Sequence, residues 1–167
     1  MRLRFEALAK RHDRSAFRSG EAALDDWFHK RAGQDDRRDV ARVFVALDGE
    51  RIAGFYSLGA FSLGFASLPE ELSAKLPRYD AIPAALIGRL ARDERYRGEG
   101  VGEMLLTDAI NRALTAARNL AIYAIVVDAK NARAAEFYRT YGFRPFPLDL
   151  DRLFVTAAKV AAAFGRE

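Results

Sequence analysis

Hydrophobic residues in the amino-terminal third of the chain follow first the period of a helix and then the pattern of paired strands. Leu24, Trp27 and Phe28 would share one face of a helix over Glu21–Arg31. The dipeptide Asp48-Gly49 is a strong signal for a hairpin turn, and it separates two runs rich in branched and aromatic residues. We therefore expect strands over Arg2–Ala7, Val43–Leu47 and Ile52–Leu63.

The second half of the chain alternates predicted strands and helices. A helix from about Val101 to Arg118 would pack inward through residues at helical spacing, namely Met104, Leu105, Ala109 and Ala113. The near-continuous apolar run Leu120–Asp128 is typical of a strand that is buried on both faces. A loop that can include a helical turn is expected over Leu68–Pro83. The other expected elements are a strand over Ile82–Ala91, a helix over Asn131–Tyr141 that ends at Gly142, strands over Phe143–Phe146 and Leu153–Thr156, and a terminal helix over Ala157–Phe164.

This order of elements predicts a mixed α/β sheet in a single domain that spans residues 1–167. The chain has no internal repeat and no low-complexity linker, and its 167 residues match the size of one ordinary domain. Half of the residues are hydrophobic and 30% are charged, which is the composition of a globular protein.

Composition excludes several kinds of site. The chain has no cysteine, so it has no disulfide, no thiolate zinc site and no cysteine nucleophile, and its two histidines, His12 and His29, leave little material for a metal centre. The first fourteen residues lack the apolar stretch of a signal peptide, and the run Leu120–Val127 is too short to cross a membrane. We therefore expect no metal, no membrane segment and a cytoplasmic location.

The glycine-rich segment Arg97-Gly98-Glu99-Gly100-Val101-Gly102 lies between a predicted strand and a predicted helix. Such a turn directs free backbone N–H groups, and the positive end of the helix dipole, toward one point. The glycines leave an anion room to approach the backbone, and Arg97 adds a positive charge. The segment therefore predicts a site for a pyrophosphate.

Two well-known phosphate loops do not match this segment. An ATP-binding loop ends in Gly-Lys-Ser/Thr, whereas here Glu103 and Met104 follow the last glycine. The dinucleotide fingerprint would need a third glycine at position 103, where this chain has glutamate. ATP and a nicotinamide cofactor are thus disfavoured.

Two motifs resemble the GNAT superfamily of N-acetyltransferases. The first is Arg97-x-x-Gly100-x-Gly102, and the second is Asn131-x-x-Ala134-x-x-Phe137-Tyr138 followed by Tyr141-Gly142-Phe143. The resemblance implies the GNAT acyl-CoA N-acyltransferase fold, which has a central mixed, mostly antiparallel sheet of about six to seven strands flanked by helices. It implies acetyl-CoA as the cofactor.

The same resemblance implies roles for individual residues. Tyr138 would protonate the departing sulfur, and a backbone N–H in the segment Leu90, Ala91 and Arg92 would stabilise the oxyanion. Asn131 would contact the cofactor together with the loop residues Arg97, Gly98, Glu99, Gly100, Val101 and Gly102. Structural alternatives remain open for two of these residues, Tyr138 as a core aromatic residue and Asn131 as a helix cap. We expect Trp27, Phe137 and Phe143 to be core residues.

The chemistry of the acceptor favours an α-amino group. A lysine side chain has a pKa of about 10.4 and needs a base, whereas an α-amino group with a pKa of about 8 is already partly neutral at physiological pH. No clear general base is visible in the motifs. An α-amino acceptor therefore has less need of a general base than a lysine side chain has.

Segments outside the two motifs resemble the TacT-type GNAT toxins of bacterial toxin–antitoxin modules. They are His12-Asp13, Phe17-x-Ser19-Gly20-x-x-x-Leu24-Asp25-x-Trp27, Val43-Phe44-Val45, Gly54-Phe55-Tyr56-Ser57-Leu58 and Ile87-Gly88-Arg89-Leu90-Ala91. The resemblance implies acetylation of the α-amino group of aminoacyl-tRNA, which blocks translation, and it implies a homodimer and a cognate antitoxin as partner.

Under this interpretation, tRNA phosphates would be bound by some of a set of basic residues: Arg11, Arg14, Arg18, Lys30, Arg31, Arg37, Arg38, Arg42, Arg89, Arg92 and Arg95. The alternative is a salt-bridged surface, because acidic residues are interspersed in the same region. Two other functions also stay open at the sequence level. One is acetylation of a small amine, an antibiotic or a protein N-terminus, and the other is a non-catalytic binding module with the same fold.

Overall fold

The computed structural model describes residues 1–165 and contains a seven-stranded sheet in the order β1-β2-β3-β4-β5-β7-β6. Strands β4 and β5 pair in parallel, whereas the pairs β1–β2, β2–β3, β5–β7 and β6–β7 are antiparallel. The predicted mixed, mostly antiparallel sheet is therefore confirmed. The strands span Arg4–Ala7 (β1), Arg42–Asp48 (β2), Arg51–Leu63 (β3), Ile82–Arg92 (β4), Ala124–Asp128 (β5), Arg144–Phe146 (β6) and Asp149–Thr156 (β7).

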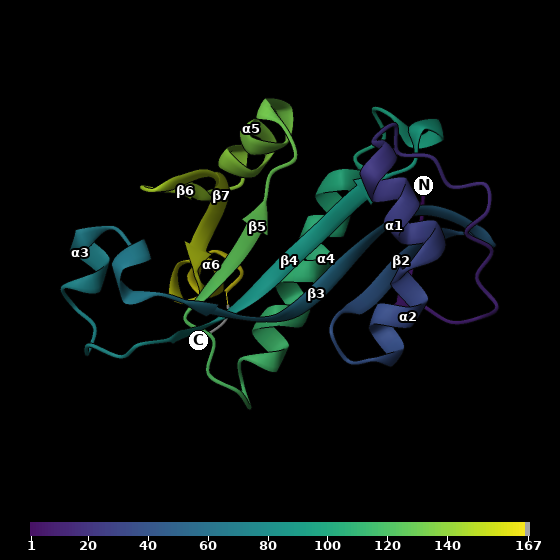
Figure 1. Ribbon diagram of the computed structural model, residues 1–167. Coiled ribbons are helices and arrows are strands. Elements are labelled where there is room, and N and C mark those ends of the chain that lie inside the picture. The colour runs from purple at the N-terminus through teal and green to yellow at the C-terminus, as the bar shows by residue number, and fades with distance from the viewer. Residues whose placement is uncertain (166–167) are drawn as a thin grey trace. The chain divides into compact units, whose positions relative to one another are not determined.

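The helices lie between these strands in chain order, as Figure 1 shows. They span Ala22–Lys30 (α1), Ala32–Arg37 (α2), Glu70–Ser73 (α3), Val101–Ala116 (α4), Ala132–Thr140 (α5) and Ala157–Ala163 (α6), with short 3₁₀ turns at Phe65–Ser67 (η1) and Glu94–Tyr96 (η2). The chain forms two compact units. The first contains residues 1–59 and 88–111, and the second contains residues 60–87 and the chain from Arg112 onward.

Aromatic side chains form the core of the first unit. Phe28 of α1 stacks flat on Phe55 of β3 with ring centroids 4.1 Å apart, and Phe17 meets both rings edge-on. Trp27 is 6% exposed, and its ring N–H donates to the Asp35 carboxylate at 2.9 Å, which confirms its predicted core position. Helices α1 and α2 thus cover the face of β2 and β3 that Phe55 occupies.

Helix α4 covers the opposite face of β3. Successive residues of a strand point to opposite faces, so Gly54 and Tyr56 face away from Phe55. A Cβ atom at Gly54 would lie 2.7 Å from Leu105 Cδ1 of α4, and the Tyr56 hydroxyl donates to the Asp108 carboxylate at 2.6 Å. The missing side chain at Gly54 lets α4 approach β3 closely, and this contact fixes the start of α4 beside β3.

The second unit is built around β5, whose residues Ala124 to Val127 are fully buried. Two antiparallel partners extend this core, because β7 pairs with β5 and β6 pairs with β7. Helices α5 and α6 contact β7, and α6 also contacts β5. Phe146 and Phe154 meet at 4.6 Å within an apolar cluster that includes Leu63, Ile82 and Val126.

Several predicted boundaries are wrong, and each has a physical reason. Strand β5 begins at Ala124, because Leu120 is 68% exposed in the turn after α4. Strand β7 begins at Asp149 rather than Leu153, because backbone pairing with β5 and β6 extends it through positions that are not buried. Helix α2 was not expected, because only its first residue, Ala32, is buried and its sequence has no apolar period.

Two side chains are also less buried than predicted. Met104 does not pack inward: it is half-buried and lines an open cavity beside α4 with Phe5 and Thr107. Phe137 is half-buried on α5, whereas Phe143 is a core residue as expected. Within residues 1–165, no helix is both long enough and apolar enough to span a membrane.

Candidate functional site

A buried side chain holds the carboxyl end of β4. The Arg89 backbone N–H donates to the Ser57 hydroxyl oxygen at 3.0 Å, and Ser57 is 2% exposed. A buried side chain thus satisfies a strand N–H just before Leu90, Ala91 and Arg92, the segment that was predicted to stabilise an oxyanion. Ala91 is buried, whereas Leu90 and Arg92 are half-buried. The backbone of this segment is therefore positioned by fixed neighbours.

Asp93 anchors the chain directly after β4. Its buried carboxylate, 1% exposed, accepts from the backbone N–H groups of Arg18 and Arg95, at 3.1 and 2.9 Å, and from two nitrogens of the Arg95 guanidinium. Burial alone would raise the pKa of Asp93, but these hydrogen bonds and the Arg95 charge hold the pKa below its ordinary value. Asp93 was not predicted, although an aspartate before a short helical turn is a recognisable cap.

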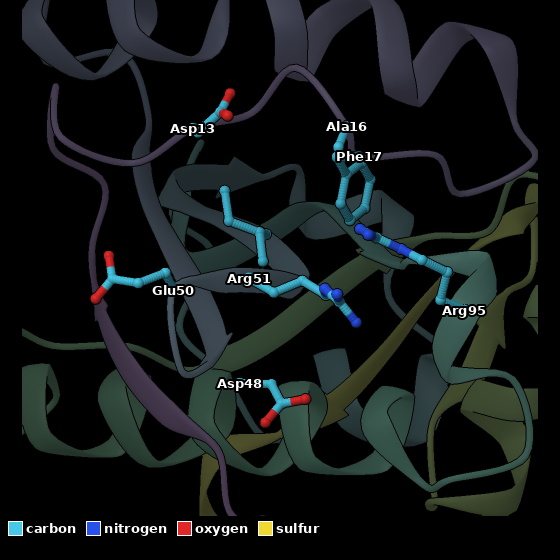
Figure 2. Close-up of a pocket in the computed structure, with 8 residues that line it drawn as sticks. Asp13, Ala16, Phe17, Asp48, Glu50, Arg51 and Arg95 are labelled. Carbon is cyan, nitrogen blue, oxygen red and sulfur yellow. The ribbon is translucent and has the colours of Figure 1, made fainter.

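Tyr96 connects this turn to the hairpin between β2 and β3. It is 5% exposed, and its hydroxyl donates to the Asp48 carboxylate at 2.7 Å. Figure 2 shows the neighbouring pocket of about 420 Å³, into which Arg51 and Arg95 extend. Three carboxylates, from Asp13, Asp48 and Glu50, line the same pocket. The pocket is therefore not a simple anion site.

The glycine loop has the conformation that an anion site needs. Gly98 and Gly100 have φ angles of +80° and +77°, which side chains rarely adopt, and the space where their Cβ atoms would lie is open apart from Met104 Cε at 4.0 Å from Gly100. Two N–H groups of the loop, from Arg97 and Glu99, are used within the turn.

Other N–H groups of the loop are available to a ligand. Within residues 1–165, the N–H groups of Gly98, Gly100, Val101 and Gly102 have no hydrogen-bond acceptor. The latter two open α4, a helix of 16 residues, and the buried Val101 side chain holds this end in place. Free donors and a helix dipole together favour a phosphate group here. The structure thus places the predicted loop residues together in one turn at the start of α4, in the first unit.

Asn131 and Tyr138 belong to the second unit, at the beginning and near the end of α5. The Asn131 side-chain oxygen accepts from the Ala134 N–H at 2.9 Å, so the capping role considered for Asn131 is confirmed. Its contact with a cofactor stays a prediction.

Tyr138 is 4% exposed and packs edge-on against Phe137 and Phe143, with ring centroids 5.3 and 5.7 Å away. In the described part of the chain no group hydrogen-bonds its hydroxyl. Burial, and then the negative charge of Asp128, raise the pKa of Tyr138 above its ordinary value. The side chain is therefore both a core aromatic residue and a neutral phenol that can donate a proton.

An ion pair that the sequence did not reveal lies in the same unit. Arg152 of β7 donates from two guanidinium nitrogens to the Asp128 carboxylate, at 2.7 and 3.3 Å, and lies 4.7 Å over the Phe61 ring. Asp128 and Arg152 are opposite each other in the β5–β7 register. Their spacing in the sequence gives no hint of this pairing, because it depends on the strand order.

Both histidines hydrogen-bond to neighbouring groups of the protein. His12 accepts from the Ala9 N–H through Nδ1 and therefore presents a protonated Nε2 to Glu6, 2.6 Å away. His29 Nε2 lies 2.9 Å from the Phe17 carbonyl oxygen. Both act as structural links. Among the described residues, no cluster of three or more histidine or acidic side chains could hold a metal ion.

Comparison with known proteins finds a family model that matches this chain and several similar proteins, of which two are toxins. The acetyltransferase (GNAT) domain matches residues 39–145. A "probable toxin TacT" of Sinorhizobium fredii (strain NBRC 101917 / NGR234) is 37% identical over 164 residues, covering 93% of this chain and 91% of the relative. A "tRNA-acetylating toxin" of Mycobacterium tuberculosis (strain ATCC 25618 / H37Rv) is 35% identical over 153 residues, covering 92% and 91%.

Solved structures of KacT and of the toxin AtaT have the same fold. A mutant of KacT superposes with a TM-score of 0.91 at 26% identity, covering 98% of this chain and 100% of that chain. AtaT complexed with acetyl-methionyl-tRNAfMet has a TM-score of 0.89 at 27% identity, covering 98% and 99%. A mutant AtaT toxin bound to the C-terminus of the antitoxin AtaR and to acetyl-CoA has a TM-score of 0.85 at 25% identity, covering 99% and 100%.

Proposed function

Since the chain belongs to the GNAT family of acetyltransferases, we propose that it transfers the acetyl group of acetyl-CoA to the α-amino group of aminoacyl-tRNA and so acts as a translation-blocking toxin. One observation carries this proposal: a tRNA-acetylating toxin matches more than nine-tenths of the chain at 35% identity. The complex of AtaT with acetyl-methionyl-tRNAfMet supports the same acceptor.

The glycine loop fits the pyrophosphate of acetyl-CoA. The free N–H groups of Gly98, Gly100, Val101 and Gly102 would donate to phosphate oxygens, and the space beside Gly98 and Gly100 is open to them. The exposed Arg97 side chain adds a positive charge, and Glu99 contributes its backbone to the turn. We assign Asn131 a cofactor contact in addition to its capping role.

The chain's own residues supply two of the three roles in acyl transfer. Acetyl-CoA supplies the thioester that the amine attacks. Backbone N–H groups in the segment Leu90, Ala91 and Arg92 would donate to the carbonyl oxygen as negative charge develops there. The Tyr138 hydroxyl would give its proton to the departing sulfur, and its raised pKa keeps that proton on the phenol at neutral pH.

The third role, removal of a proton from the amine, needs no strong base if the acceptor is an α-amino group. Its pKa of about 8 leaves a useful neutral fraction at physiological pH, in contrast to about 10.4 for lysine. His12 offers no free basic nitrogen, because both of its ring nitrogens are engaged, and His29 is held through Nε2 at the Phe17 carbonyl oxygen. An α-amino acceptor therefore matches the groups that the chain provides.

We further propose that the protein acts in the cytoplasm, where aminoacyl-tRNA is present, as a homodimer that a cognate antitoxin neutralises. The complex of AtaT with the C-terminus of its antitoxin supports the last part. The two units, residues 1–59 with 88–111 and the remainder, would then act as one catalytic domain.

A labelling experiment tests the proposed reaction. The protein is incubated with labelled acetyl-CoA and, in separate reactions, with charged tRNA, deacylated tRNA or a mixture of small amines and antibiotics. Label in charged tRNA alone is the expected result. Label in the small amines instead would favour the alternative acceptor, and no label in any reaction would favour a non-catalytic binding module.

A further inference from the structure

A group of basic side chains lies outside the groups described above. The loop between β1 and α1 carries Lys10, Arg11, Arg14 and Arg18, which we call the basic cradle. These residues line an open cavity of about 600 Å³ together with His12, Asp13, Ser15 and His29. Four cations thus face one carboxylate, whereas the pocket of Figure 2 has two arginines and three carboxylates.

Most cations of the basic cradle have no carboxylate partner. Arg18 is exposed and donates to the carbonyl oxygens of Ser15 and Phe17, and Arg14 donates to the Phe28 carbonyl oxygen at 2.7 Å. Within residues 1–165, Lys10 makes no ion pair. Arg11 does pair, with Glu6. The cradle therefore keeps most of its positive charge.

A fifth cation joins the cradle from α2. Near Gly33, the guanidinium groups of Arg14 and Arg37 converge, since a Cβ atom there would lie 3.5 Å from Arg14 Nη2 and 3.1 Å from Arg37 Nη1. Burial, and then the charge of Arg37, lower the pKa of Arg14. Two guanidinium groups held so close repel each other, and a bound anion would offset this repulsion.

Three other basic residues of this unit are neutralised by ion pairs. Lys30 pairs with Asp26 at 2.7 Å, and Arg42 pairs with Asp36 and Asp39. Arg95 pairs with the buried Asp93. The alternative of a salt-bridged surface is therefore correct for these three residues. By contrast, Lys10, Arg14 and Arg18 of the cradle and Arg37 beside it are in no ion pair within residues 1–165.

We propose that the basic cradle, with Arg37, binds consecutive phosphates of the tRNA backbone. Guanidinium groups match phosphate oxygens in a bidentate geometry, and a row of cations on one loop suits a chain of phosphodiesters. Contacts of this kind position the RNA without reading its sequence. The identification of the RNA as tRNA rests on the proposed function, whereas the anion site rests on the structure.

Binding of deacylated tRNA at several salt concentrations tests this proposal. We compare the wild type with a double variant, Lys10→Gln with Arg18→Gln, and with a control of the same charge change, Lys30→Gln with Arg42→Gln. Fluorescence anisotropy of labelled tRNA gives the affinity. Loss of two phosphate contacts should reduce the slope of log affinity against log salt by about 1.5 to 2 and weaken binding about tenfold or more. The control should leave the slope unchanged.

The outcomes distinguish the proposal that the basic cradle binds tRNA from the proposal that the protein acetylates aminoacyl-tRNA. If the cradle binds tRNA, the double variant should raise the KM for aminoacyl-tRNA while kcat and acetyl-CoA binding stay near wild type. An unchanged slope in the double variant, or an equal loss in the control, would overturn the cradle. Loss of antitoxin binding with unchanged tRNA affinity would also overturn it. If no charged tRNA is acetylated, the proposed function fails. The binding experiment still tests whether the basic cradle binds tRNA phosphates.

Discussion

Tyr138 is a packed core residue to which we also assign a chemical role. Two aromatic contacts, with Phe137 and Phe143, fix its ring, and burial keeps its hydroxyl neutral. We predict that Tyr138→Phe binds acetyl-CoA with nearly wild-type affinity, because the ring and its contacts remain. Acetyl transfer should fall about 100-fold or more, since a general acid typically contributes that much. Calorimetric binding and single-turnover kinetics check the two parts, and unchanged transfer would remove Tyr138 from the mechanism.

Asp93 is expected to matter for stability. In Asp93→Asn, the amide can no longer accept from both Arg95 and the Arg18 N–H, so unfolding at pH 7 should become easier by about 1–3 kcal/mol. Because folding lowers the pKa of Asp93 from 3.8, its stabilisation is present above that pH and is lost as the pH falls through the folded-state pKa.

The difference in free energy of unfolding between wild type and Asp93→Asn should therefore become smaller when urea unfolding is repeated at progressively more acidic pH below about 4. A difference that stays constant down to the lowest pH would show that the charge of Asp93 contributes nothing.

The roles of individual residues could be predicted from the sequence only in part. The roles proposed for Gly100 and Tyr138 follow from motifs in which the relevant residues are close in sequence. Asp93 could have been found as a cap, whereas the pair of Asp128 with Arg152 depends on β7 lying beside β5, which no local pattern specifies.

At the scale of elements, the glycine loop makes a sharp prediction. Gly100→Glu should abolish measurable acetyl-CoA binding, because it places a carboxylate beside the free N–H groups and strains a residue with φ of +77°. Gly49→Glu is the matched control: Gly49 has φ of +63° and open space around it, but it lies in the β2–β3 turn. Isothermal titration measures both. Equal losses in the two variants would indicate strain or charge alone, and normal binding by Gly100→Glu would refute the loop assignment.

The contact of α4 with β3 provides a second prediction at this scale. Gly54→Ala should destabilise the protein by about 1–3 kcal/mol, because the new methyl group would lie 2.7 Å from Leu105 Cδ1 and 2.9 Å from the Ala91 carbonyl oxygen. Gly59→Ala in the same strand should cost little, since its nearest neighbour would be 3.6 Å away. Thermal and urea unfolding compare the two, and equal stabilities would contradict the packing argument.

Elements with a strong local signal were predicted well, and those set by tertiary context were not. The period of α4 and the turn at Gly49 identify their elements within a few residues. Helix α2 has a single buried residue, so no hydrophobic period marks it. The apolar run from Leu120 was too long as a strand prediction, because its first residues form the exposed turn after α4.

For the whole molecule, charge is informative only when its partners are known. The chain carries 27 basic and 23 acidic residues, a net charge of +4 that alone would not indicate RNA binding. Ion pairs neutralise Lys30, Arg42 and Arg95, which leaves the basic cradle as a local concentration of positive charge. If tRNA is bound through this patch, both the affinity for tRNA and the rate of its acetylation at low tRNA concentration should fall markedly as the salt concentration rises.

The central claim is that the α-amino group of aminoacyl-tRNA receives the acetyl group. The most direct measurement is to treat a pool of charged tRNA with acetyl-CoA and either wild-type protein or Tyr138→Phe, digest the RNA to release the 3′-terminal aminoacyl-adenosine, and analyse it by mass spectrometry. The account predicts aminoacyl-adenosine heavier by one acetyl group, with the acetyl on the amino acid nitrogen, in the wild-type reaction and little or none with the variant. Unmodified aminoacyl-adenosine in the wild-type reaction would contradict it.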